Sequence, residues 1–399
     1  MADPAAPARA ARLPGIERLR VVATVCVVMF HAAVTYMPHP LPQVRWATYD
    51  ATTPWADAAA WIASAFQMPV FFVLGGFGAA GLLNKLGPRA AVRHRLRRLG
   101  GPLLLGMVLI LPLSLYAWLL GYAADGAIPL RKLKSLKLGE AGEGLWGLCH
   151  LWFLQHLLIF CLGAIGLRAA GWRTPESWRR VLTSPPGLAG LALATSVPLF
   201  LRPAILIGFR HSFWPLPMNL AFYAPFFAVG TLLVEPPASL RLADHRRSGL
   251  RAFGAVHVVT GLISLACAWP LIATHIDHGL PASSRWAMAF LFSAACWLIS
   301  VGAFAAATRG RRPLSAPTAY FAAASIWVYF LHHPVVGLAQ VALKPLEWAP
   351  AAKFAAVTAY GLAVPLLTYE AWVRRTWVGR VLGVRHPERV AVEERRRAA

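Results

Sequence analysis

Long apolar stretches follow one another along the whole chain, separated by short polar segments. Each has about the ~20 apolar residues that a helix needs to cross a lipid bilayer. The pattern therefore predicts an all-α, polytopic integral membrane protein with about ten transmembrane helices in one bundle. The expected spans are residues 18–37, 58–83, 100–122, 148–170, 187–209, 216–235, 252–274, 286–307, 317–343 and 353–372.

Composition agrees with this class. Of the 399 residues 58% are hydrophobic and 14% are charged, whereas about a quarter of a soluble domain is charged. Residues 1–15 are rich in Ala and Pro and are expected to be a disordered N-terminal segment. Residues 16–373 form the membrane domain, and residues 374–399 form a charged cytoplasmic tail. Any chemistry must take place within the helix bundle.

The formal net charge of +23 is explained by topology. With the N-terminus in the cytoplasm, 29 of the 39 Lys and Arg residues fall in the inner segments. The positive-inside rule therefore predicts that both termini are cytoplasmic. The same distribution argues against nucleic acid as a partner and favours contact with membrane lipids.

Two connecting segments have patterns of their own. Residues 84–99 are expected to be a short, densely basic inner loop, in which Arg93, Arg95 and Arg98 are positively charged. Residues 124–144 form the longest outer segment, and the leucines at 130, 133 and 136 suggest a short helix at the membrane interface.

The first span has a polar stripe. Arg20 and His31 are 11 residues apart, so they differ by only ~20° around a helix and by ~16 Å along it. Glu17, Thr24 and Thr35 lie on or near the same face. An ionisable residue at mid-membrane depth should face the bundle interior or a water-filled cavity. A lone histidine there is equally consistent with a core residue that bonds a neighbouring helix, but the aligned stripe favours a function.

Later spans add further polar groups. His156 lies deep in the fourth span, and Tyr329, His332 and His333 lie toward the outer end of the ninth. These four are candidates for the side of the site that receives a substrate, although His332 and His333 could equally bond within the bundle. The stretch "HIDH" at 275–278 resembles a metal clip, but it is short, is expected in a loop and lacks a third partner. No metal is expected.

Four motifs occur in order along nearly the whole chain. They are the R-x10-H spacing from Arg20 to His31, "FQMPVFFVLGGF" in the second span, "HLWFL" in the fourth and "YFLHHP" in the ninth. Together they resemble the acyltransferase-3 family of membrane proteins, and in particular its branch that succinylates periplasmic glucans.

The resemblance implies transfer of an acetyl or succinyl group from cytoplasmic acyl-CoA to a hydroxyl of an extracytoplasmic glycan, in the inner membrane of a bacterium. It implies that His31 is essential, as base or acyl relay, and that Arg20 accompanies it. The family's R-x-x-R pair maps to Arg95 and Arg98, with Arg93 adjacent.

One position departs from the family pattern. The second-span motif usually reads "FF-x-x-SG", and here Gly75 stands where the serine is expected. A role for that hydroxyl is therefore in doubt in this chain.

The chemistry of the residues fits the same activity. Acyl transfer from a thioester to a hydroxyl needs a base that titrates near neutral pH, and histidine is the usual one. Coenzyme A carries several phosphates, and arginine binds phosphate with two parallel hydrogen bonds.

Two other classes of protein compete with the enzyme. A transporter or flippase also needs a polar path through a bundle, but it is usually built from paired, internally symmetric broken helices. The interrupted second span has no counterpart in the other half of the chain. A sensor or structural membrane protein would account for the spans but not for the polar stripe.

Overall fold

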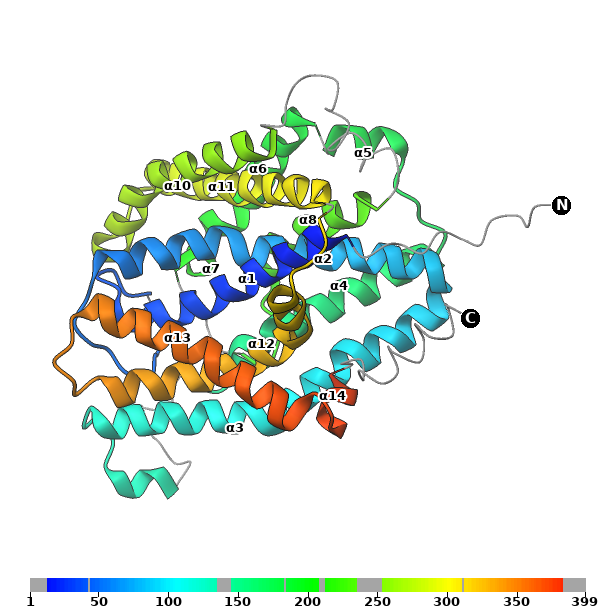
Figure 1. Cartoon of the computed structure of the whole chain (residues 1–399). Helices are drawn as coiled ribbons and strands as arrows, with labels where there is room; N and C mark the ends of the chain where they lie inside the picture. Colours follow the sequence, from blue (N-terminus) through cyan, green and yellow to red (C-terminus); the bar gives the residue numbers. More distant parts are fainter. Residues whose placement is uncertain are drawn as a thin grey trace.

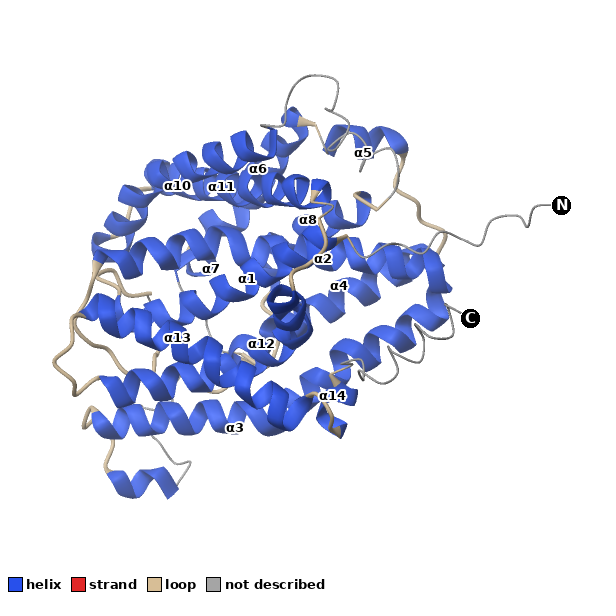
Figure 2. Cartoon of the chain, in the orientation of Figure 1, coloured by secondary structure: helices blue, strands red, loops and turns tan. Residues whose placement is uncertain are grey.

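The computed structural model describes residues 13–41, 44–134, 145–182, 184–207, 212–234, 253–310 and 312–382. Within these ranges every regular element is a helix (Figure 2), which confirms the all-α prediction. The elements are α1 (Pro14–Ala33), η1 (Val34–Tyr36), α2 (Pro54–Arg95), η2 (Leu96–Gly100), α3 (Gly101–Ala124), η3 (Leu130–Lys134), η5 (Cys149–Leu151), α4 (Trp152–Ala169), α5 (Glu176–Leu182), α6 (Pro185–Leu201), α7 (Ala204–Ile207), α8 (Pro217–Leu232), α10 (Phe253–His278), α11 (Ala282–Arg309), α12 (Ala316–Leu343), α13 (Pro350–Thr368), η7 (Tyr369–Val373) and α14 (Trp377–Val381).

Each of the ten expected spans coincides with a helix. Seven helical stretches of the described chain are long and apolar enough to cross a membrane. One of them, 71 residues long, contains α2 and α3 joined through η2 and thus holds two of the expected spans. Helices α6 and α8 are shorter, with 17 and 16 residues. The chain is therefore a multi-pass membrane protein, and ten crossings stay a prediction.

Helix α1 is central to the bundle. It packs against α2, α11, α12 and α13, and it crosses the middle of the molecule in Figure 1. Its residues are small or β-branched along the buried face, where Ala23, Val28 and Ala32 are fully buried. Such residues allow neighbouring helices to approach closely. The part of the polar stripe with Thr24, His31 and Thr35 therefore lies inside the protein, whereas the Arg20 side chain is 40% exposed.

The segments expected on the inner side gather at one end of the bundle (Figure 1). The Gly15 N–H donates to the Gly310 carbonyl at 3.1 Å. Arg98 Nη1 donates to the Leu382 carbonyl at 3.1 Å. The start of α1, the segment after α11, the link between α2 and α3, and α14 are thus neighbours, as one common side of a membrane requires.

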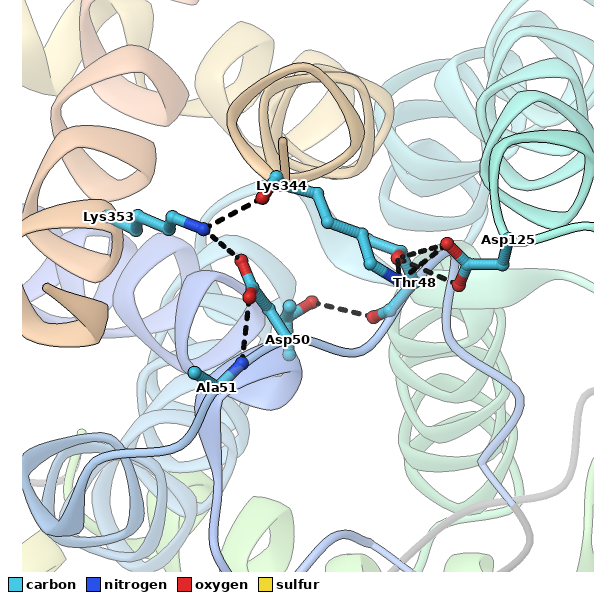
Figure 3. Close-up of polar contacts among 7 residues, drawn as sticks. Thr48, Asp50, Ala51, Asp125, Lys344 and Lys353 are labelled. Atoms are coloured by element: carbon cyan, nitrogen blue, oxygen red, sulfur yellow. Dashed lines mark hydrogen bonds and ion pairs between the residues drawn. The ribbon is translucent and has the colours of Figure 1, made fainter. Parts of the chain in front are cut away.

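The segments expected outside meet at the opposite end (Figure 3). Lys353 Nζ donates to Asp50 Oδ2 at 2.7 Å and to the Lys344 carbonyl at 2.9 Å. Lys344 Nζ donates to Asp125 Oδ1 at 2.6 Å and to the Thr48 hydroxyl oxygen at 3.1 Å. These bonds hold the segment between η1 and α2 (residues 37–53, here called the outer loop) against the ends of α3, α12 and α13.

Residues 84–99 are helical apart from one break, so the prediction of a loop in this segment is wrong. The helix breaks at a single residue, Gly87, whose φ of 72° is in the left-handed region. Glycine adopts such a backbone without a Cβ clash, and Pro88 is suited to the first position of the helix that follows. The chain turns at this point and continues as a basic helix into η2 and α3.

Helices α2 and α8 are in backbone contact. A Cβ built on Gly76 would lie 2.0 Å from the Phe227 carbonyl oxygen, and one built on Gly230 would lie 2.1 Å from the Val73 carbonyl oxygen. A side chain at either position would force the helices apart. The glycines of the second span thus permit the close approach that their sequence suggests.

Other boundaries differ in detail. Helix α1 begins at Pro14, inside the expected N-terminal segment, and residues 1–12 lie outside the described residues. The "HIDH" stretch forms the last turn of α10 and is not a loop. The expected interfacial helix is the 3-10 helix η3, and residue 136 is outside the described part. The tail contains α14, and residues 383–399 are not described.

Candidate active site

His31 belongs to a cluster of four histidines in the interior of the bundle. The ring centroid of His31 lies 4.9 Å from that of His332 and 5.2 Å from that of His333. His150, from η5, stacks on His333 at 4.6 Å. Among the described residues no group of His, Cys, Asp or Glu could hold a metal ion. The rings contact one another directly, an arrangement in which imidazoles can exchange hydrogen bonds.

The hydrogen bonds of His31 and His332 define their neutral forms. His31 Nδ1 is 2.8 Å from the Val27 carbonyl oxygen, and His332 Nδ1 is 3.0 Å from the Val328 carbonyl oxygen. A carbonyl oxygen only accepts, so both Nδ1 atoms carry hydrogen. The neutral ring of His31 therefore has its lone pair on Nε2, which is the atom that can take a proton from a substrate.

A cavity of about 80 Å³ adjoins His31. It is bordered by His150 and Tyr329, and by the amide side chains of Gln67 and Asn219. Gln67 is only 4% exposed, and its Oε1 is buried with no hydrogen-bond partner among the described residues. A buried amide without a partner is costly. Its place beside the cavity indicates a group that binds a ligand.

The outer loop covers the opposite side of His31. Trp46 stacks on the His31 ring with a centroid distance of 5.7 Å, and its Nε1 donates to Gln340 Oε1 at 2.7 Å. Gln340 Nε2 donates to the carbonyls of His31 and Ala32 at 3.2 and 3.1 Å. The loop, α12 and the end of α1 are thus joined around one imidazole.

The expected substrate-side residues have different places. Tyr329 borders the cavity and donates its hydroxyl hydrogen to the His150 carbonyl at 2.5 Å. His332 and His333 are fully buried. Neither of them is among the described residues that border the cavity. His156 is also buried and away from the cavity, with Nδ1 donating to the Trp152 carbonyl at 2.9 Å.

His333 connects the cluster to α3. Its ring stacks on Trp118 at 4.6 Å with an interplanar angle of 7°, and its Nδ1 is 3.3 Å from the Ser114 hydroxyl oxygen. Ser114 and Trp118 also border a second cavity of about 390 Å³ with a mainly apolar wall.

Arg20 lies three turns from His31 along α1. It forms an ion pair with Glu17 at 2.6 Å and donates to the Ala322 carbonyl on α12 at 2.6 Å. These bonds connect the first turns of α1 to α12. Arg20 and His31 thus share one helix but occupy opposite ends of its buried part.

The three arginines of the basic helix point in different directions. Arg93 is exposed, whereas Arg95 and Arg98 are half-buried. Arg95 turns back along α2, so that its Nη2 lies 3.9 Å from a Cβ built on Gly78, and its Nε is buried without a partner among the described residues. Arg98 donates to the Leu382 carbonyl. Of these three arginines, only Arg95 has a buried guanidinium nitrogen that lacks a hydrogen-bond partner among the described residues.

Gly75 faces α4. A Cβ built on it would lie 2.5 Å from Leu157 Cδ1, the far end of a flexible side chain. Gly75 is not among the described residues that border the cavity. A serine at this position would direct its hydroxyl toward the contact between α2 and α4.

Sequence reasoning misses Gln67, Asn219, Trp46 and Gln340. Gln67 has a signal in the sequence, because it is a polar residue within the second-span motif. Asn219 and Gln340 lie in the spans but on no recognisable stripe, and Trp46 lies in a loop without a pattern. Only their positions in three dimensions associate them with His31.

Comparison with known proteins identifies the family of the chain. The acyltransferase-3 family model, which describes an acyltransferase domain, matches residues 13–370. The chain is 25% identical over 377 residues to "Glucans biosynthesis protein C" of Salmonella heidelberg (strain SL476), covering 86% of this chain and 88% of that protein. The protein of the same name from Salmonella paratyphi B (strain ATCC BAA-1250 / SPB7) is 24% identical with the same coverage. No solved structure matches the chain.

The family model covers nearly the whole chain, and the family resemblance that the four motifs indicated is confirmed. This chain belongs to the acyltransferase-3 family of membrane acyltransferases.

Proposed function

We propose that this protein transfers an acetyl or succinyl group from cytoplasmic acyl-CoA to a hydroxyl of an extracytoplasmic glycan, and that His31 is the general base. The observation that carries the proposal is the cavity that His31 and the buried amide side chain of Gln67 both border. Acyl transfer to a hydroxyl needs a base beside groups that can donate hydrogen bonds to the reacting carbonyl.

The size of the cavity suits the reacting ends of two substrates. Its ~80 Å³ is well below the roughly 300–1,000 Å³ of sites that enclose a whole drug-sized ligand. The thioester would therefore reach it from the inner end of the bundle and the hydroxyl from the outer end. The bodies of the coenzyme and of the glycan remain outside.

The reaction then balances with residues of this chain. His31 Nε2 removes the proton of the acceptor hydroxyl as its oxygen forms a bond to the acyl carbon. The thioester C–S bond breaks, and the imidazolium of His31 returns its proton to the departing coenzyme A thiolate. Gln67 and Asn219 can donate amide hydrogens to the negative charge that develops on the carbonyl oxygen.

Arg95 supports a donor site at the inner end. Its guanidinium is half-buried against α2 and its Nε has no partner among the described residues. Phosphate is the anion that arginine binds best in such a setting. Arg98 and the exposed Arg93 lie on the same helix and add positive charge around it.

The relatives' names support a carbohydrate acceptor. Two similar proteins are named for the biosynthesis of glucans, and they come from Salmonella strains. We extend the acceptor class and a location in the bacterial inner membrane, with both termini in the cytoplasm, to this chain. The outer loop would then face the glycan.

The test uses purified protein in liposomes with labelled acyl-CoA and a glucan acceptor. The wild-type protein is expected to release free coenzyme A and to label the glucan, whereas His31→Ala lowers this rate by at least ~10²-fold, as loss of a general base does. A His31→Ala protein that retains more than a tenth of the activity would exclude His31 as the base. A protein that moves the glycan but consumes no acyl-CoA would be a transporter.

Orientation is tested with sealed vesicles. Acyl-CoA does not cross a membrane, so inside-out vesicles should label their internal glucan while right-side-out vesicles should not. Labelling by right-side-out vesicles alone would place the donor site outside, and equal labelling in both preparations would mean that acyl-CoA reaches its site from either face. Either result would remove Arg95 from the donor site.

A further inference from the structure

His332 is a fully buried partner of His31 and is not among the residues that border the cavity. Its Nε2 lies 3.2 Å from His31 Nδ1, and its own Nδ1 donates to the Val328 carbonyl at 3.0 Å. With hydrogen on Nδ1, the Nε2 of neutral His332 has a lone pair that accepts from the His31 Nδ1–H. The two residues are 301 positions apart in the chain.

We propose that His332 is a positioning residue of the transfer reaction, which holds the ring of His31 with Nε2 toward the cavity and accepts a hydrogen bond from its imidazolium. The inference rests on the proposed function of His31. It gives His332 the place that a carboxylate has beside the histidine of a hydrolase triad, where the partner orients the ring and stabilises its charged form.

A neutral partner suits this environment. The titratable groups that face His332 are His31 from α1, His150 from η5, and Tyr329 and His333 from α12. None of these four groups carries a negative charge in its ordinary state. A carboxylate would be buried here without a cation whenever His31 is neutral, which is costly in a low dielectric. An imidazole lone pair accepts the same bond without that cost.

Two acceptors share the Nδ1–H of His31. The Val27 carbonyl is at 2.8 Å and belongs to the same helix, and His332 Nε2 is at 3.2 Å and comes from α12. The carbonyl alone sets which nitrogen carries hydrogen, whereas His332 also sets the rotation of the ring toward α12. Loss of His332 should therefore weaken the charged form of His31 and widen the motion of its ring.

The experiment compares His332→Gln with His332→Phe in the liposome assay. Glutamine can place its amide oxygen near the position of Nε2, so we expect its kcat to stay within about fivefold of wild type. Phenylalanine fills the space but cannot accept, so kcat should fall about 10- to 100-fold while the KM for acyl-CoA stays within twofold. The acid limb of the pH–rate profile should move to lower pH in His332→Phe, because the imidazolium of His31 has lost an acceptor.

Val328→Ala is the control for general loosening. It truncates a fully buried side chain on the same helix and leaves the backbone carbonyl in place, so it should lower thermal stability without moving the acid limb. A His332→Gln protein as inactive as His332→Phe would overturn the proposal, and so would an unmoved acid limb in His332→Phe. If the His332→Phe protein does not accumulate, the kcat of His332→Gln alone tests the proposal. A value within about fivefold of wild type supports it, and a larger loss overturns it. Activity retained in His31→Ala would instead refute the proposed function.

Discussion

Trp46 Nε1 donates to Gln340 Oε1 at 2.7 Å, and this bond joins the outer loop to α12 directly beside His31. The same Gln340 amide donates to the carbonyls of His31 and Ala32 at the end of α1. Helix α1 ends at Ala33 and passes into the 3-10 helix η1, so its regular α-helical hydrogen bonding stops at these carbonyls. Gln340 therefore provides hydrogen-bond partners both for backbone carbonyls at the end of α1 and for the indole N–H of the outer loop.

Gln340→Leu should lower the free energy of unfolding by about 1–3 kcal/mol, because the buried indole N–H of Trp46 loses its acceptor. Turnover should fall with it, since the loop that stacks on His31 is loosened. Thermal unfolding in detergent and initial rates measure the two effects. The double variant Trp46→Phe/Gln340→Leu should lose less than the sum of the single losses. Strictly additive losses would mean that the two side chains act independently.

Lys353→Met should be among the most destabilising changes at the outer end. Lys353 forms an ion pair with Asp50 (Figure 3). The two side chains are only 5% and 12% exposed, and removal of one partner of a buried ion pair costs about 3–5 kcal/mol. Asp50→Asn in the same protein should recover part of the loss. Arg374→Met is the matched control, because its pair with Glu370 is much more exposed and should contribute only about 0.3–0.5 kcal/mol. Similar melting temperatures for the two single variants would refute the prediction.

Gly76→Ala should disrupt the contact between α2 and α8. Its Cβ would lie 2.0 Å from the Phe227 carbonyl oxygen, and overpacking of this kind costs roughly 1–3 kcal/mol or more. Gly81 on the same helix has no atom within 4 Å of a Cβ, so Gly81→Ala should be neutral or slightly stabilising. The amount of folded protein after solubilisation distinguishes them, and equal yields would contradict the packing.

Gly75→Ser restores the residue that the family motif has. Only Leu157 Cδ1 must move to admit it, so the protein should fold normally. Because this position faces α4 and does not border the cavity, we expect kcat to change by less than about threefold. A large gain in kcat would show that the hydroxyl reaches the reacting groups after all.

Arg95→Ala should raise the KM for acyl-CoA about 10-fold with little effect on kcat, because it removes a cation from binding and not from the chemical step. Arg97 is the matched control, since it is an exposed arginine two positions away. Arg97→Ala changes the net charge equally and should leave KM within twofold. Equal increases in both variants would mean that only the overall charge of this helix matters.

Local patterns along the chain were sufficient to predict the class of the protein. Apolar length and period depend on neighbouring residues alone, so the membrane helices and the stripe from Arg20 to His31 could be recognised before any contact was known. The motifs indicated the family in the same way. The charge of residues 84–99 predicts a loop, but the segment is helical. The chain can change direction there without a loop because a single residue, Gly87, has a left-handed backbone conformation.

The tertiary structure alone decides how the site is assembled. His332 and His333 are adjacent in the sequence, but neighbouring positions on a helix point ~100° apart, so one bonds His31 and the other stacks on Trp118. Which of them hydrogen-bonds His31 depends on the rotation of α12 against α1, and that rotation results from packing over the whole bundle. For the same reason Gln67, Gln340 and Trp46 become part of the site only where three separate segments meet around one imidazole.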